Sequence, residues 1–178
     1  MKSPIYPLMP RQPVPDLSVS VVGNGHWTLI DQTPDQFTMV VFYRGLHCPV
    51  CAKYLRELEV LLPEFTARGV QIIVLSTDTQ ERAEQAKVNW HLDGLTVGYG
   101  LDLHVARQWG LYLSASRGVA EPAVFSEPGV FLVRPDHTLY YGSTQTMPFA
   151  RPAFRDLLGA VDYALAKDYP ARGEVVDF

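Results

Sequence analysis

The sequence predicts an α/β fold in which helices cover both faces of a central mixed β-sheet. Two near-continuous apolar runs, residues 37–43 and 70–75, are rich in β-branched and aromatic residues, as strands buried on both faces are. A helical stripe of apolar residues follows the first run, and a short hairpin with a last helix closes the chain. This alternation is typical of a layered α/β domain, and 178 residues are enough for one such domain.

The chain begins with a Pro-rich arm, residues 1–15, which holds Pro4, Pro7, Pro10, Pro13 and Pro15. Because proline lacks the N–H that a central strand needs, we expect an extended arm that lies across the domain or reaches a partner subunit. Residues 17–22 and 26–30 flank Gly23-Asn24-Gly25 and predict a β-hairpin that extends the sheet at its N-terminal end. We expect the domain over residues 16–168 and a C-terminal tail over 169–178.

The first long helix is expected to begin near Cys48 and to stop at Gly69. Pro63 should kink or split it, because proline removes one helical hydrogen bond. After the strand at 70–75, Ser76-Thr77-Asp78 offers N-caps for a helix over 79–90.

The remaining elements are shorter. Residues 95–97 are a strand candidate, and Asp102 should cap a helix that Gly110 stops. Residues 111–127 lack periodicity and are expected to form a loop. Strands over 130–133 and 138–141 should surround a turn, and a last helix is expected over 153–166.

The chemistry of the chain centres on Cys48 and Cys51, its only two cysteines. A Cys-x-x-Cys pair at a strand-to-helix turn indicates a redox-active dithiol. The helix dipole would favour a thiolate at Cys48, and residues three apart on a helix have Cβ atoms roughly 5–6 Å apart, near disulfide range. Arg44 and His47 come just before the pair and are candidates for tuning the thiolate; His47 is equally well a plain loop residue.

Three other interpretations of the pair remain open. Half of a zinc site is disfavoured, because structural zinc takes four ligands and no second Cys pair exists. A purely structural disulfide would close too small a loop to restrict the unfolded chain much. Two inert buried thiols are the third interpretation. The redox-active dithiol requires neither a metal nor an organic cofactor, and we expect neither.

Composition excludes several classes of function. The net charge is −4 and no long basic run is present, so binding to nucleic acid has little electrostatic support. No apolar stretch approaches the about 20 residues needed to span a bilayer, and residues 1–15 show no signal-peptide pattern. Two cysteines without a secretion signal suit a reducing compartment, so a cytoplasmic location is expected.

Local matches to one known family lie in three stretches: residues 42–51, residues 74–81, and residues 99–106 with Trp109-Gly110-Leu111. Through these stretches the sequence resembles the peroxiredoxin-like (alkyl hydroperoxide reductase/thiol-specific antioxidant) branch of the thioredoxin fold, over roughly residues 14–166. The resemblance implies a thioredoxin-like fold and thiol-dependent redox activity.

The sequence also departs from the family's active-site pattern. Peroxiredoxins carry Pro-x-x-x-Thr-x-x-Cys, and without gaps the peroxide-attacking Cys falls on Cys51, the Thr on Cys48 and the Pro on Arg44. The family's late Arg falls on Pro128, so its thiolate-stabilising charge is expected to be lost unless Arg44, Arg117 or Arg134 replaces it. The resemblance to thioredoxin implies that Pro128 is cis and forms a wall of the site.

The sequence therefore favours a thiol–disulfide oxidoreductase in which Cys48 attacks and Cys51 resolves the mixed disulfide. Its partners would be a thiol reductant or a protein disulfide, and a homodimer is left open. The first alternative is a thiol peroxidase that acts on hydroperoxides through Cys51. The second is a redox sensor or partner-binding protein whose dithiol switches without turnover.

Overall fold

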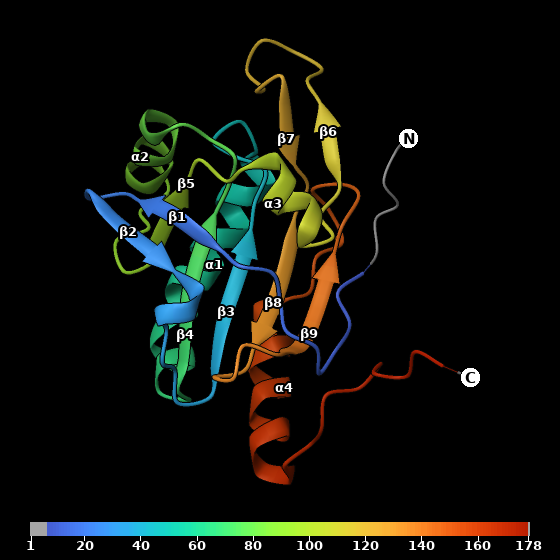
Figure 1. The fold of residues 1–178 in the computed structure, drawn as a ribbon. Coiled ribbons are helices and arrows are strands. Elements are labelled where there is room, and N and C mark those ends of the chain that lie inside the picture. The colour runs from blue at the N-terminus through green and yellow to red at the C-terminus, as the bar shows by residue number, and fades with distance from the viewer. Residues whose placement is uncertain (1–6, 178) are drawn as a thin grey trace.

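The computed structural model describes residues 7–177, and their centre is a seven-stranded mixed sheet with the strand order β2-β1-β5-β4-β3-β8-β9 (Figure 1). The strands of this sheet are β1 (Ser18–Val21), β2 (Gly25–Thr28), β3 (Phe37–Phe42), β4 (Val70–Leu75), β5 (Thr96–Tyr99), β8 (Gly129–Val133) and β9 (Leu139–Thr144). The strands β3, β4 and β5 run parallel, and the others join them antiparallel. The predicted mixed α/β sheet and its N-terminal hairpin are confirmed.

The central strand β3 is buried along its whole length, because it pairs with β4 on one side and with β8 on the other. Its side chains alternate between two cores. Met39 and Val41 face a core with α1 (Pro49–Thr66), α2 (Gln80–Asn89) and α4 (Phe154–Lys167). Val40 and Phe42 face a second core, which contains Trp109 beside α3 (Leu103–Gln108). Helices therefore cover both faces of the sheet, as the apolar strand pattern predicts.

Three local predictions need correction. Residues 111–127 are not a plain loop, because β6 (Leu113–Ala115) and β7 (Val124–Ser126) pair as a hairpin that projects beyond the sheet (Figure 1). The helix α1 continues through Pro63, so the predicted split is absent, while a kink there stays a prediction. The cap of α2 is Thr79, whose hydroxyl accepts from the Arg82 N–H, rather than a residue of 76–78. The Asp102 cap of α3 is confirmed.

The described part of the Pro-rich arm runs beside β9. The Arg11 N–H donates to the Leu139 carbonyl and the Leu139 N–H donates to Gln12, both at 2.8–2.9 Å. Pro13 forms a single antiparallel bridge with Thr138. The start of the C-terminal tail also packs on the domain, since Ala171 is buried and its carbonyl accepts from Arg11 Nε. The division into arm, domain and tail stays a prediction, and residues 1–6 and 178 lie outside the described residues.

Candidate active site

The two cysteines lie where β3 ends and α1 begins. Cys48 is the N-cap of α1, with an extended backbone, and Pro49 occupies the first helical position, where its missing N–H costs nothing. The connecting loop turns at Gly45, whose φ of 135° lies in a region that side chains rarely adopt. The Cys48 N–H donates to the Gly45 carbonyl at 3.1 Å, which closes the turn. Strand, turn and helix start thus fix the position of Cys48.

The two sulfurs form one interacting pair. The Cys51 N–H donates to Cys48 Sγ at 3.2 Å, so the sulfur takes the place of a capping oxygen. The hydrogen bond from the Cys51 thiol, together with that N–H and the nearby Arg151, lowers the pKa of Cys48 to about 6. Burial and the same thiol contact raise the pKa of Cys51 well above its usual range. Near neutral pH, Cys48 is therefore the thiolate and Cys51 the thiol.

An arginine that the sequence analysis missed contacts both cysteines. Arg151 Nη2 lies 2.9 Å from Cys51 Sγ and 3.8 Å from Cys48 Sγ. The expectation that the thiolate-stabilising charge is lost, or is replaced by Arg117 or Arg134, is wrong. Neither Arg117 nor Arg134 is among the charges that lower the pKa of Cys48, and the Arg134 guanidinium lies over the Tyr140 ring.

The position of Arg151 is fixed by its neighbours. Its Nε donates to the Pro148 carbonyl at 2.8 Å, and its guanidinium lies 4.8 Å from the centre of the Tyr54 ring in α1. The Tyr54 hydroxyl donates to the Pro152 carbonyl at 2.6 Å, which ties the segment before α4 to α1. A signal for this residue exists in the sequence, because Arg151 is the one cation between β9 and α4.

Arg44 also lies at the site, but acidic groups engage its charge. Its Nε lies 3.1 Å from Glu127 Oε2, its Nη2 lies 3.8 Å from Glu121 Oε1, and its guanidinium covers the Phe125 ring. Its charge makes a smaller contribution to the lowered pKa of Cys48. Arg44 thus mainly joins the site loop, which is residues 43–48 between β3 and α1, to the β6–β7 hairpin.

His47 does not supply the positive charge that the sequence suggests. Burial, followed by the charge of Arg44, lowers its pKa, so the ring is neutral near pH 7. The ring packs edge-on against Phe125, with 4.7 Å between ring centres, and Nδ1 lies 3.4 Å from Arg82 Nη2. Its other nitrogen is buried without a partner in the described residues. The geometry gives His47 a packing role in the loop.

Pro128 lies at the edge of the sheet where the site loop begins. Because Phe42 pairs with Gly129 in the antiparallel register of β3 and β8, Pro128 lies opposite Tyr43. Pro128 is buried, and its carbonyl accepts from the Gln145 N–H at 2.9 Å. The Glu127–Pro128 bond is trans, as are the other peptide bonds of residues 7–177, so the expected cis bond is wrong. The role of Pro128 as a wall of the site stays a prediction.

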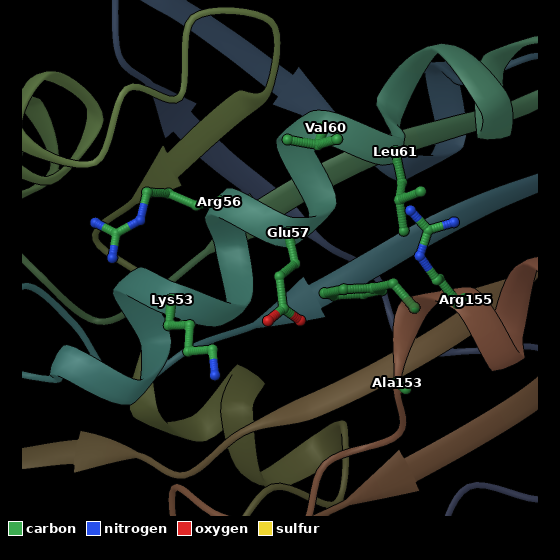
Figure 2. Close-up of a pocket in the computed structure, with 8 residues that line it drawn as sticks. Lys53, Arg56, Glu57, Val60, Leu61, Ala153 and Arg155 are labelled. Carbon is green, nitrogen blue, oxygen red and sulfur yellow. The ribbon is translucent and has the colours of Figure 1, made fainter.

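A groove of about 600 Å³ adjoins the segment that carries Arg151. Figure 2 shows Lys53, Glu57 and Leu61 on α1 and Arg155 at the start of α4 around it. Phe154 lines the groove and stacks on Tyr54 with 4.1 Å between ring centres. The groove thus combines an apolar floor with exposed charges.

Residues 7–177 contain no cluster of three or more His, Cys, Asp or Glu residues that could hold a metal ion. None of the helices in that range is both long enough and apolar enough to cross a membrane.

Comparison with known proteins points to one family. The sequence model of the AhpC/TSA family matches residues 10–142 of this chain. A "Probable 1-Cys peroxiredoxin" from Syntrichia ruralis is 37% identical over 68 residues, which are 38% of this chain and 31% of that protein. The chain thus matches about a third of the length of this relative.

Solved structures with the same fold are more distant in sequence. Peroxidoxin BcpB from Mycobacterium tuberculosis has a TM-score of 0.72 at 18% identity, over 89% of this chain and 98% of that one. A mutant of peroxiredoxin 6 from Arenicola marina has a TM-score of 0.73 at 18% identity, over 90% of this chain and 76% of that one. These likenesses confirm the predicted thioredoxin-like fold.

Proposed function

Because the chain belongs to the AhpC/TSA family, we propose that it is a thiol-dependent oxidoreductase whose reacting groups are Cys48 and Cys51. The observation that carries the proposal is the contact of one guanidinium, that of Arg151, with both sulfurs. A nearby cation favours a thiolate over a thiol, and an adjacent second thiol allows the pair to close as a disulfide. The dithiol is thus equipped for a full redox cycle.

Cys48 is the attacking sulfur in this proposal. It is the thiol with the lowered pKa, and it receives the Cys51 N–H at the N-terminus of α1. Cys51 keeps its proton and stands ready to attack the Cys48 sulfur once that sulfur is oxidised. This assignment differs from the ungapped family pattern, in which the peroxide-attacking position is Cys51.

The substrate that fits the site best is a hydroperoxide. Only 1% of Cys48 and none of Cys51 is exposed, so a small oxidant reaches the sulfurs more easily than a disulfide on a protein surface. Peroxide reduction also needs donors directed at the charge that develops on the leaving oxygen, and Arg151 is such a donor. The peroxidase, which the sequence analysis placed second, therefore becomes the first choice.

The proposed catalytic cycle begins at Cys48, whose thiolate attacks the terminal oxygen of the hydroperoxide. An S–O bond forms, the O–O bond breaks, and the leaving alkoxide takes a proton from water. Cys48 is then a sulfenic acid. The Cys51 thiol attacks the Cys48 sulfur, the S–O bond breaks, and hydroxide leaves with the Cys51 proton as water. A thiol reductant supplies two electrons and two protons to reopen the disulfide.

Thiol–disulfide exchange remains the second candidate function, for a specific reason. The position of the family's Thr hydroxyl is occupied by Cys48, so one donor of the peroxidase pattern is absent. A low-pKa thiol with a resolving thiol three residues later is the minimal equipment for exchange. A small disulfide, rather than a protein disulfide, suits the buried sulfurs.

The test measures how fast Cys48→Ser and Cys51→Ser react with two oxidants, hydrogen peroxide and a small aromatic disulfide. Thr79→Ser is the control variant. Cys51→Ser should accumulate a sulfenic acid on Cys48 that dimedone traps, because the resolving thiol is gone. Cys48→Ser should react at least tenfold more slowly. If Cys48→Ser still forms sulfenic acid at the wild-type rate and Cys51→Ser does not, Cys51 is the attacking residue and the assignment is wrong.

Turnover separates the substrate classes. With a dithiol reductant in excess, the wild-type protein should consume hydrogen peroxide faster than the disulfide. The reverse order would select the exchange reaction. If the protein consumes only one equivalent of either oxidant and then stops, it is a redox sensor, and both enzymatic functions are wrong.

A further inference from the structure

Asp78 is a buried carboxylate outside the dithiol that no catalytic step above uses. Its side chain is fully buried. It accepts two short hydrogen bonds of 2.7 Å, one from the Leu46 N–H to Oδ2 and one from Arg82 Nε to Oδ1. Burying a carboxylate is costly unless it is paired and hydrogen-bonded, and both conditions are met here. The cap of α2 belongs to Thr79, so Asp78 is free to serve the site loop.

The site loop packs directly on this carboxylate. A Cβ atom at Gly45 would lie 2.8 Å from both carboxylate oxygens, so only glycine lets the loop approach so closely. The Gly45 carbonyl in turn accepts the Cys48 N–H, and Leu46 donates to Asp78 from within the same turn. The carboxylate therefore supports the turn that ends at the attacking sulfur.

Arg82 joins this support to the other elements of the site. Besides Asp78, its Nη2 lies 3.3 Å from the Ala120 carbonyl in the β6–β7 hairpin and 3.4 Å from His47 Nδ1. One guanidinium thus links the end of β4, the site loop and the hairpin.

We propose that Asp78 is a positioning residue: with Arg82, it holds the Gly45–Cys48 turn so that the Cys48 sulfur meets the Cys51 N–H and Arg151. This inference rests on the proposed function, because it concerns the sulfur that attacks. Asp78 acts through the turn and Arg82, and no contact between Asp78 and a sulfur is required.

The direction in which the pKa of Cys48 shifts when Asp78 is replaced distinguishes a positioning role from a purely electrostatic one. Removing a negative charge favours a nearby thiolate, so a purely electrostatic Asp78 would lower the pKa of Cys48 when replaced by alanine. Loss of the turn would instead withdraw the N–H and guanidinium donors and raise that pKa. The variant leaves the other charged groups that act on Cys48, Arg151 before α4 and Arg44 in the loop, chemically unchanged, so a raised pKa would report that Cys48 has moved relative to them.

The experiment measures the rate of Cys48 alkylation by iodoacetamide against pH, read by mass spectrometry of the Cys48 peptide in the full-length reduced protein. For Asp78→Ala, the midpoint should rise by about one pH unit, so alkylation at pH 6 should fall roughly fivefold. Asp102→Asn, which changes an exposed carboxylate at the cap of α3, is the matched control and should leave the midpoint unchanged.

Gly45→Ala gives the same test without any change of charge. Its new Cβ atom would displace the loop from the Asp78 carboxylate, so the midpoint should rise here too. If Asp78→Ala does not fold, the alkylation midpoint of Gly45→Ala alone tests the positioning role. An unchanged or lowered midpoint in either folded variant would overturn the positioning role. Alkylation needs no turnover, so this result stands apart from the Cys48→Ser and Cys51→Ser test of the proposed function.

Discussion

The Nη2 atom of Arg151 lies 2.9 Å from the Sγ atom of Cys51, although 100 residues separate them in the chain. The same nitrogen lies 3.8 Å from Cys48 Sγ, so one positive charge lies beside both sulfurs. The Tyr54 ring and the Pro148 carbonyl hold this guanidinium in place.

Replacing Arg151 should slow the reaction with hydrogen peroxide. We expect Arg151→Gln to reduce the second-order rate constant by about tenfold to a hundredfold, because one fixed donor to the developing charge is lost. Arg151→Lys should recover part of the rate, since it keeps the charge without the planar fork. Stopped-flow measurement of peroxide consumption checks this, with the exposed Arg107→Gln as control. A wild-type rate in Arg151→Gln would remove this residue from the mechanism.

The reactivity of Cys48 should follow a pKa of about 6 rather than the ordinary thiol value of 9.0. Iodoacetamide labelling of the wild-type protein should therefore rise between pH 5 and 7 and then level off. Cys51, whose pKa is raised, should stay unlabelled over that range. Labelling of Cys51 before Cys48 would reverse the assignment of the two roles.

The lowered pKa of Cys48 also predicts how the thermal stability of the reduced protein depends on pH. A folded-state pKa below the unfolded value gives a stabilisation that is complete above the unfolded pKa and disappears as the pH falls through the folded one. The Tm of the reduced protein should thus rise from pH 6 to 8 by an amount that Cys48→Ser lacks. Calorimetry of both proteins at several pH values measures the difference. Identical slopes would argue against a depressed pKa.

Cys48 and Cys51 should form a reversible disulfide, because their sulfurs already interact across one helical turn. After one equivalent of hydrogen peroxide, neither cysteine should be alkylated, and reduction with dithiothreitol should restore both. Mass spectrometry with thiol alkylation before and after reduction gives the answer. Two thiols that stay alkylatable after oxidation would contradict the whole redox assignment.

Glu127 should be important for stability, because it is 3% exposed and pairs with Arg44 while accepting from the Ser114 hydroxyl at 2.6 Å. Glu127→Ala leaves the partly buried Arg44 with only its longer contact to Glu121, at 3.8 Å, so we expect the free energy of unfolding to fall by about 2 kcal/mol. Denaturation by urea measures the change. Asp162→Ala, which breaks the solvent-exposed pair with Arg68, should have a clearly smaller effect. Equal effects would show that burial does not decide the strength of these pairs.

Pro63→Ala should stabilise the protein. Pro63 is exposed inside α1, where it removes a helical hydrogen bond that alanine restores. The greater freedom of the unfolded chain offsets part of this gain, so we expect an increase of about 1–2 kcal/mol in the free energy of unfolding. Thermal and urea denaturation measure it, with Glu64→Ala as the neighbouring control. A lower stability would mean that Pro63 has a packing role that its exposure does not reveal.

Hydrophobic periodicity, turn residues and capping residues together predicted most of the fold correctly. The strand over 70–75 has the predicted bounds, and the hairpin around Gly23-Asn24-Gly25 and the Asp102 cap are present. The pairing of residues 113–115 with 124–126 was missed, because three-residue strands are too short to show an alternating pattern. Ser76-Thr77-Asp78 also misled the prediction, since capping residues one position apart look alike in sequence while only Thr79 has the cap geometry.

The dithiol and its place at the start of a helix could be predicted from the sequence, because both depend on residues within a few positions of each other. The cation that lies beside the dithiol could be identified only in the folded structure. The strand β9 is antiparallel to β8, which is antiparallel to β3, so β9 and β3 end at the same edge of the sheet. The loop that carries Arg151 thereby meets the loop that carries Cys48. That meeting depends on strand order and register, which no local pattern around residue 151 contains.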